Sequence, residues 1–128
     1  MNNRYLYRAK QKNWRELPKE KWWVEGYLYG IWERRYILWD MINDVPNMIE
    51  VDPSTICQCT GFKDKNGKLI WENDIVKISG HIYVCYWDEY NFEWGLKSKT
   101  ETVGLGYIDK CIIEVIGNIF DNPELLEV

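Results

Sequence analysis

With 128 residues, 46% hydrophobic and 28% charged, the chain can bury a core, which excludes an intrinsically disordered protein. Eight Trp and nine Tyr are unusual, and since so small a core cannot hold all these rings, some must lie at a surface, where aromatic side chains anchor interfaces. The net charge of −4 is unevenly distributed: residues 1–21 carry seven basic and two acidic side chains, and residues 101–128 carry one basic and six acidic.

The N-terminus has no apolar segment like that of a signal peptide, and no apolar run approaches the length that spans a membrane. We therefore expect a cytoplasmic protein. In that compartment the four cysteines should remain thiols. The oppositely charged ends could pair within one protomer or between protomers of an oligomer, or could simply be solvated.

Strand signals dominate the first 50 residues. Alternating polar and apolar residues predict a strand at 4–8, and aromatic and β-branched residues predict antiparallel strands at 22–29 and 34–39. Pro18 favours a loop over 16–21. A connection follows from Asp44 to Pro53, so we place a boundary near it and predict an N-terminal β sub-structure at 1–50 and a second part at 51–128. The alternative is one integrated domain.

The second part has turns at short intervals. Asp64-Lys65-Asn66-Gly67 has the composition of a hairpin turn, and strands are expected at 74–78, 81–87, 92–96, 107–108 and 111–120. Short strands at this spacing predict a sandwich or barrel, and their pattern is similar to an SH3-like small β-barrel. Pro123 after Asn122 predicts one short C-terminal helical turn. The fold class is therefore mainly β.

Two segments carry a family resemblance. Residues 51–76 read VDPSTICQCTGFKDKNGKLIWENDIV, and Glu114 to Phe120 is followed by Asn-Pro-Glu-Leu-Leu. These segments, with Trp23-Val24-Glu25-Gly26-Tyr27 near the N-terminus, resemble the YopX family of phage and prophage proteins, whose biochemical role is unassigned. The resemblance implies a mainly β fold and a phage or prophage setting, but it brings no catalytic residues.

The thiols and the single histidine are the first candidates for a metal or catalytic site. Cys57, Cys59, His81 and Cys85 offer four ligands in principle, but zinc knuckles usually use Cys-x2-Cys in turns, and buried free Cys acts as a small hydrophobe. A Cys–His nucleophile would also need an orienting group. We expect no metal, no cofactor and no catalytic residue.

Neighbouring acidic residues do not change this expectation. Glu72 and Asp74 flank Asn73, and at such spacing carboxylates are far more often turn formers than a catalytic pair. Asn73 stands where family members usually have Gly, and Asn tolerates a left-handed backbone. A backbone role for Asn73 is therefore the simpler interpretation.

Polar residues of the signature form a candidate binding patch: Thr55, Gln58, Thr60 and Asp64. Irregular connections beside hairpins often carry binding groups. The alternative, which we favour, is that these side chains satisfy backbone groups of the same connection.

A basic and aromatic N-terminal segment supports a different partner. Cations that contact phosphates and rings that stack on bases suit single-stranded nucleic acid. The candidate contacts are Arg4, Arg8, Lys10, Lys12, Trp14 and Arg15. Against this stand the sequence pI near 5.1 and the absence of any known nucleic-acid box.

The aromatic excess and the opposed charges favour a non-catalytic accessory protein that self-associates and binds another, unidentified protein. Nucleic-acid binding by a small barrel is the alternative. An enzyme acting through carboxylates would need two acids in a cleft with perturbed pKa values, which the sequence cannot reveal.

Overall fold

The computed structural model describes residues 5–42 and 45–127, with side chains described outside 40–46. The described residues form two antiparallel sheets and short 3-10 turns, so the expected mainly β class is confirmed. The strands are β1 (Tyr7–Lys10), β2 (Trp23–Ile31), β3 (Arg34–Ile42), β4 (Val45–Val51), β5 (Cys57–Lys63), β6 (Leu69–Trp71), β7 (Asp74–Ile78), β8 (His81–Asp88), β9 (Glu93–Lys97), β10 (Thr102–Gly104) and β11 (Glu114–Asn118). The 3-10 turns are η2 (Trp14–Glu16), η3 (Lys19–Lys21), η4 (Pro53–Thr55), η5 (Leu105–Tyr107), η6 (Lys110–Ile112) and η7 (Pro123–Leu126).

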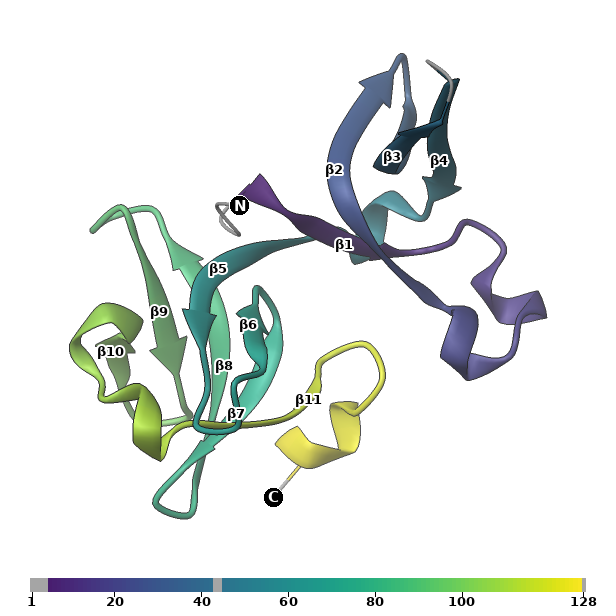
Figure 1. Cartoon of the computed structure of the whole chain (residues 1–128). Coiled ribbons are helices and arrows are strands. Elements are labelled where there is room, and N and C mark those ends of the chain that lie inside the picture. The colour runs from purple at the N-terminus through teal and green to yellow at the C-terminus, as the bar shows by residue number, and fades with distance from the viewer. Residues whose placement is uncertain (1–4, 43–44, 128) are drawn as a thin grey trace. The chain divides into compact units, whose positions relative to one another are not determined.

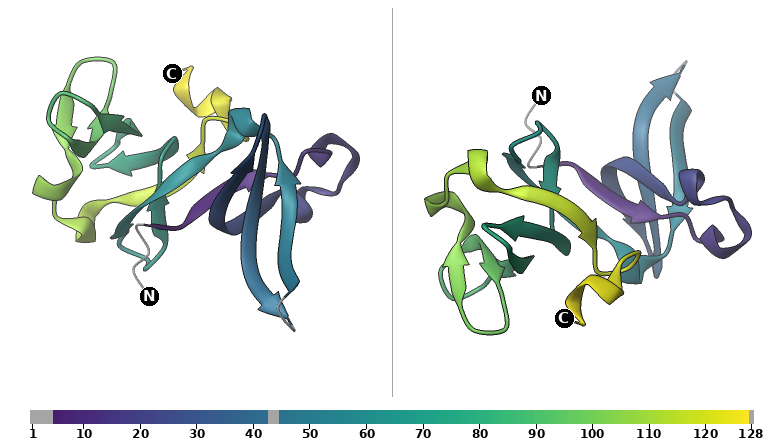
Figure 2. Two further views of the ribbon diagram at one scale, coloured as in Figure 1. Left: turned by 90° about the horizontal axis from the view of Figure 1, so that it is seen from above. Right: turned by 90° about the horizontal axis from the view of Figure 1, so that it is seen from below.

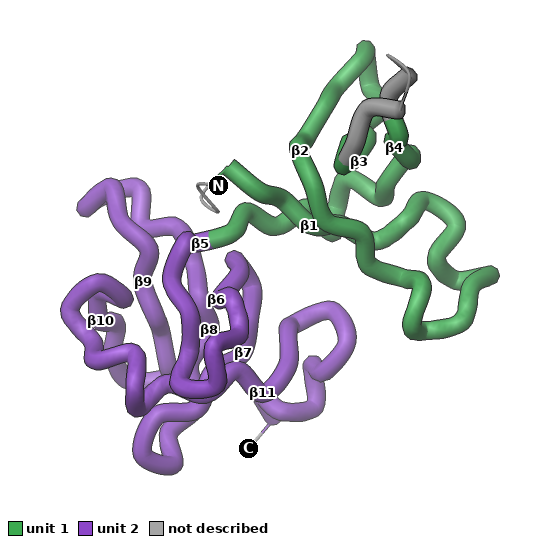
Figure 3. The backbone as a smooth tube through the Cα atoms, viewed as in Figure 1, with its two compact units in different colours: residues 1–59 green, residues 60–128 purple. Residues whose placement is uncertain are grey.

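The chain divides into two compact units, Met1–Cys59 and Thr60–Val128 (Figure 3). The division falls inside β5, whose first residues pair with β1 in unit 1 and whose remainder continues into unit 2. The boundary expected at residue 50 lies at the end of β4, whose last residue, Val51, packs in the core of unit 1.

Unit 1 is built on the antiparallel strand order β4-β3-β2-β1-β5. The strands β2, β3 and β4 lie side by side in Figures 1 and 2. Residues facing one another across an antiparallel pair share a face of the sheet. The face that carries Ala9, Ile37 and Val51 is the buried core of the unit, with Val24 and Ile49 packed against it.

The strand β4 is a correction to the connection expected between residues 44 and 53. It pairs with β3 over its whole length, with Met41 opposite Pro46. Pro46 lacks a backbone donor, which discourages a central strand. β4 lies at the edge of the sheet, where the outer side needs no donor. The first strand is also displaced, because β1 begins at Tyr7 rather than at residue 4.

Unit 2 contains the antiparallel sheet β10-β9-β8-β7-β11 and the β5–β6 hairpin. The hairpin supplies Phe62 and Ile70 to a core completed by the five-stranded sheet and the η5 and η6 segments. The hairpin turn at 64–67 is confirmed, with Gly67 at a φ of 79°. The buried residues of this core are Ile70, Val76, Tyr83, Cys85, Leu96, Leu105 and Ile113.

The C-terminal part of unit 2 departs from the expected strands. Residues 107–108 fall at the end of η5, and the run expected at 111–120 begins with the 3-10 turn η6. Asp109 causes this second difference, because its carboxylate accepts a hydrogen bond from the Cys111 backbone N–H and caps the turn. The short turn η7 is confirmed with Pro123 as its first residue, although the Asn122 amide oxygen accepts from Asn118 N–H instead of capping η7.

Close approach of β2 to β3 depends on Gly26. A Cβ at this position would lie 2.4 Å from the Leu38 carbonyl oxygen, which is a backbone atom that cannot rotate away. We expect Gly26→Ala to lower the free energy of unfolding by about 1–3 kcal/mol through overpacking. Chemical denaturation followed by circular dichroism measures this change.

Gly106→Ala is the matched control, because no atom outside its neighbours lies within 4 Å of a Cβ built there and its φ is not positive. It should leave the unfolding free energy nearly unchanged. Equal stability of the Gly26 and Gly106 variants would contradict the close approach of the two strands.

Candidate functional site

Asp64 is buried and holds the β5–β6 turn to β11. One carboxylate oxygen accepts from the backbone N–H groups of Asn66 and Lys68, each at 2.9 Å. The other accepts from the Val115 backbone N–H at 2.9 Å, although Val115 lies 51 positions away. Burial raises the pKa of Asp64, but these donors outweigh it and hold the pKa below its usual range. Three donors therefore occupy this carboxylate.

The two threonines of the predicted patch also bond to backbone. Thr60 is 2% exposed, and its hydroxyl donates to the Ile70 carbonyl at 2.7 Å and accepts from Phe62 N–H. Thr55 is 4% exposed, donates to the Asp52 carbonyl and accepts from the Lys10 backbone N–H at 2.8 Å. These hydrogen bonds agree with the interpretation that the side chains of the patch satisfy backbone groups.

The predicted patch is also divided between the two units. Thr55 and Gln58 belong to unit 1, whereas Thr60 and Asp64 belong to unit 2. Gln58 is half-buried and pairs with Tyr7 across β5 and β1. Ligand contact by any of the four stays a prediction.

Lys10 lies within a cage of tryptophan rings and is only 2% exposed. Its Nζ is 3.9 Å from the Trp14 ring centroid and 4.3 Å from that of Trp22. The Trp23 ring lies 5.5 Å away. A desolvated cation is attracted to the negative faces of such rings. The cage positions the loop between β1 and β2, and it removes Lys10 from the surface that a phosphate could reach.

Neighbouring cations of the predicted nucleic-acid segment also make contacts within the chain. The Arg15 guanidinium lies 4.3 Å from the Trp14 ring, and that of Arg8 lies 4.9 Å from Trp23. The Trp14 indole donates to the Asp52 carboxylate at 3.2 Å. Arg4 lies outside the described residues. Stacking on a base would have to displace cations that already cover these rings.

The Asp52 carboxylate also caps the turn η4. It accepts from the Ser54 backbone N–H and hydroxyl. Burial raises its pKa, but these bonds, the Trp14 indole and the Arg15 charge together bring the pKa below the usual range. The acid therefore serves the local turn and the aromatic cage.

The thiols and His81 do not converge on one site. Cys57 and Cys59 are buried in unit 1, Cys85 is buried in the core of unit 2, and His81 is exposed at the start of β8. Within the described part of the chain, no group of three or more His, Cys, Asp or Glu side chains is arranged to hold a metal ion.

The sequence analysis overlooked a surface on β2, β3 and β4. The register places Tyr29 opposite Tyr36 and Tyr27 opposite Leu38, on the face opposite to the core. We name this surface the hairpin face and define it by the following residues: Tyr27, Tyr29, Ile31, Trp32, Arg34, Tyr36, Leu38, Met48 and Glu50. The exposed fractions of Tyr27, Tyr29, Ile31 and Met48 are 41%, 45%, 40% and 38%.

Trp32 stands at the tip of this face. Ile31 pairs with Arg34, so Trp32 and Glu33 form a two-residue loop. Trp32 is 93% exposed and has a φ of 56°. Hairpin loops of this length need a positive φ at the first position, where Gly, Asn or Asp is usual and a bulky side chain is strained. The Trp32 carbonyl accepts a hydrogen bond from Arg35 Nη1 at 3.0 Å, but its side chain is almost entirely exposed to solvent.

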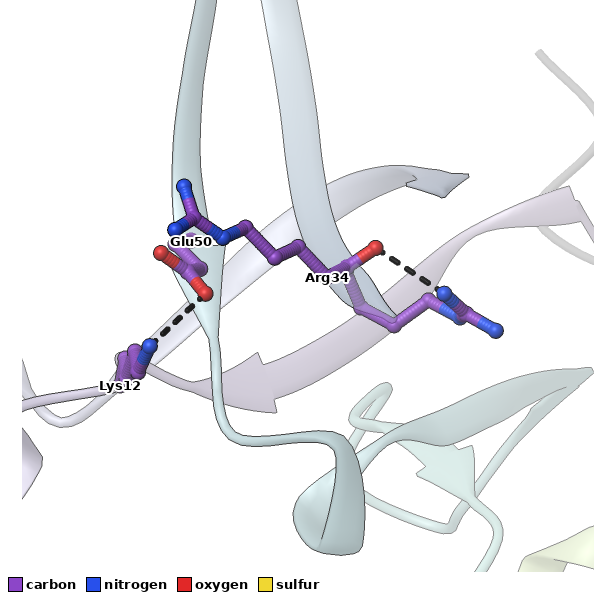
Figure 4. Close-up of polar contacts among 4 residues, drawn as sticks. Lys12, Arg34 and Glu50 are labelled. Atoms are coloured by element: carbon purple, nitrogen blue, oxygen red, sulfur yellow. Dashed lines mark hydrogen bonds and ion pairs between the residues drawn. The ribbon is translucent and has the colours of Figure 1, made fainter. Parts of the chain in front are cut away.

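The hairpin face has a charged rim with both signs. Glu50 accepts from Lys12 Nζ at 3.1 Å, and Figure 4 shows the Arg34 guanidinium extending toward the same carboxylate. A hydrogen bond with Tyr36 raises the pKa of Arg34, and the Glu50 charge raises it further. A hollow of about 550 Å³ beside the tip is lined by Ile31, Trp32, Glu33, Arg34 and Tyr36.

The sequence does contain a signal for this surface. Gly30 ends the aromatic run and Arg34 begins the next, so the link is too short for anything except a tight turn. A tight turn without Gly, Asn or Asp at its centre implies strain. The sequence analysis treated the link only as a connection and did not weigh its tryptophan.

Known proteins with similar sequence and fold identify the family of this chain. The family model described as YopX protein matches residues 6–127, nearly the whole described chain. The chain belongs to the YopX family. No curated protein matches it. The crystal structure of protein yopX from Bacillus subtilis is similar, with a TM-score of 0.55 and 24% identity over 100% of this chain and 98% of that one. At this identity the likeness concerns the fold alone.

Residues 5–42 and 45–127 of this YopX-family chain include no helix that is long and apolar enough to cross a bilayer.

The bonds of Asp64 predict a measurable loss of stability in this YopX-family protein. In Asp64→Asn the amide NH₂ replaces one acceptor and faces a backbone N–H, so we expect the unfolding free energy to fall by about 2–4 kcal/mol. Because the folded pKa of Asp64 is lowered, its contribution is present above the unfolded pKa of about 4 and is lost as the pH falls through the folded value.

Denaturant unfolding of wild type and variant across this acidic range measures the effect. Asp88→Asn is the control, because the Asp88 carboxylate accepts from the Tyr90 and Asn91 backbone N–H groups in an exposed turn, so this change should cost much less stability than Asp64→Asn. A difference between wild type and Asp64→Asn that does not shrink at acidic pH would exclude the carboxylate as its source.

The tryptophan cage predicts a graded response at Lys10. Lys10→Met keeps an unbranched apolar stem but loses the charge, whereas Lys10→Ala also leaves a cavity. We expect unfolding free energies in the order wild type, Met, Ala, with a total loss of about 2–5 kcal/mol for Ala. Thermal unfolding followed by tryptophan fluorescence reports both the stability and the cage.

Lys12→Met controls for loss of charge in the same segment, because the Lys12 side chain is 64% exposed and its ion pair is a surface one. A Lys10→Met variant as stable as the wild type would show that contact between the Lys10 charge and the rings does not stabilise the fold.

Proposed function

We propose that this YopX-family chain is a non-catalytic binding module that self-associates through its hairpin face. The observation that carries the proposal is Trp32, a strained and 93% exposed tryptophan at the end of an apolar strand face. Trp, Tyr and Arg are the residue types enriched in interface hot spots, and the hairpin face combines all three.

A second copy of the chain fits the chemistry of this face. In a two-fold interface the same patch meets itself, so the patch must be complementary to itself. Arg34 and Glu50 lie on neighbouring strands of the face, with one positive and one negative charge. Within one protomer Glu50 already binds Lys12 and attracts Arg34, so a copy related by a two-fold axis can exchange the Arg34–Glu50 attraction for the same attraction across the interface while the tyrosines of both copies pack between them. This arrangement also shields Trp32 from water.

Trp32→Gly separates binding from folding. Glycine adopts a positive φ without strain, so this variant should raise the unfolding free energy of the monomer by about 1 kcal/mol. The same change removes the proposed anchor and should therefore weaken self-association. A variant that is more stable yet less associated cannot be explained by damage to the fold.

Sedimentation velocity over a wide concentration range measures the association. We expect the wild type to shift toward a larger species as concentration rises, and Trp32→Gly and Tyr29→Ser to remain monomeric. Tyr107→Ser is the control, because Tyr107 is 83% exposed but lies in unit 2. A wild type that stays monomeric, or a Tyr107 variant that loses association equally, would refute the hairpin face as the interface.

Three further interpretations stay predictions. An SH3-like barrel in unit 2 is supported by the shared core of the β5–β6 hairpin and the five-stranded sheet, although the described residues form no closed barrel. The binding of another protein and of nucleic acid also stay predictions. Nucleic-acid binding has less support, because Lys10 is buried and the Trp14 ring is covered by Lys10 and Arg15.

A further inference from the structure

A groove of about 480 Å³ lies in unit 2 and is lined by residues of that unit. It is bordered by the start of β8, by the segment that follows β9 and by the C-terminal turn η7. The lining residues are Gly80, His81, Ile82, Val84, Lys97, Ser98, Lys99, Thr100, Leu125 and Leu126. A volume of this size falls within the range of roughly 300–1,000 Å³ that is usual for ligand sites.

The groove combines an apolar floor with a basic rim. Ile82 and Val84 come from alternate positions of β8 and therefore point to the same face, and η7 adds Leu125 and Leu126. Lys97 and Lys99 supply positive charge, and no Asp or Glu is among the lining residues. This is notable because the chain has a net charge of −4. The groove therefore favours a ligand with both carboxylates and apolar side chains.

The backbone of β8 adds a second feature that points to a peptide. Among the described strand pairs, the last between β8 and β9 joins Val84 to Lys97. The start of β8, from His81 to Tyr83, therefore extends beyond β9 and has no strand partner on that side. After Lys97 the chain turns away through a bend in which Ser98 accepts from the backbone N–H groups of Thr100 and Glu101. Extended peptides add to strand edges of this kind through main-chain hydrogen bonds.

We infer that this groove binds an extended acidic peptide segment whose carboxylates and leucine-like side chains lie on the same side of the peptide strand. The peptide backbone pairs with the free edge at His81 to Tyr83, and its apolar side chains enter the floor. Its carboxylates meet Lys97 and Lys99 at the rim. Both kinds of side chain must come from every second position of the peptide, because successive side chains of a strand point to opposite sides and Lys97 shares the face of Val84, its partner across β8 and β9. This site is independent of the proposed self-association, since no residue of the hairpin face takes part.

The test uses the full chain and a fluorescein-labelled peptide in which every second residue is Leu or Glu in turn and the residues between them are Ser, with binding followed by fluorescence anisotropy. We expect saturable binding that weakens as salt concentration rises. The double variant Lys97→Ala, Lys99→Ala should bind about tenfold more weakly. Val84→Asp should abolish binding, because it places a carboxylate on the floor.

Lys77→Ala is the matched control. Lys77 pairs with Ile82 across β7 and β8 and is exposed, but it does not line the groove. Its loss should leave the affinity unchanged. Failure of the wild type to bind, or equal weakening by the Lys77 variant, would overturn the proposal.

Two competitors decide the chemistry of the ligand. A peptide with Ser in place of every Leu has the same charge without the apolar side chains, and it should compete about tenfold less well or worse. A single-stranded oligonucleotide should not displace the labelled peptide. Equal competition by the Ser peptide or displacement by the oligonucleotide would identify a general polyanion surface and refute a peptide site.

Discussion

Unit 2 depends above all on the Asp64 carboxylate, which brings together parts of the chain that are distant in sequence. A hairpin turn normally needs only local bonds, and one oxygen of Asp64 supplies these through Asn66 and Lys68. The other oxygen accepts from the Val115 backbone N–H, so the turn is held against the start of β11. Lys65 adds a backbone bond to Ile113. The core that contains Ile113 is thereby closed by a polar contact.

In unit 1, Lys10 likewise connects parts of the chain that are distant in sequence. Its backbone N–H binds the Thr55 hydroxyl, while its side chain lies among tryptophan rings supplied by the following loop. The buried ammonium is tolerated because ring faces partly replace the water that it loses. The family signature and the aromatic N-terminal segment thus meet at one residue. Composition alone suggests that lysines and tryptophans offer a nucleic-acid surface, but here they satisfy one another.

The sequence predicted those elements that are determined locally. The turn at Gly67, the positive φ of Asn73, the strand β7 and the turn at Pro123 all follow from residue types within a few positions. The strand β4 could not be predicted, because Pro46 is compatible with a strand only at a sheet edge, and the edge is a property of the whole topology. The three bonds of Asp64 were likewise beyond local reasoning, since one donor lies 51 positions away.

The hairpin face was missed for a related reason, and the reason bears on function. A tryptophan between two strands looks like one more apolar residue until the register places it in a two-residue loop at a φ of 56°. Only then is the strain of its backbone evident, and glycine at that position would relieve this strain. A bulky residue in this backbone conformation lowers the stability of the monomer, and this cost is the reason for proposing a contact outside the monomer. Phe92 presents the same combination in unit 2, with a φ of 52° and 80% exposure in the loop between β8 and β9. Two hairpin tips thus each present an exposed aromatic ring on a backbone of positive φ, and a contact outside the monomer is the proposal that accounts for both.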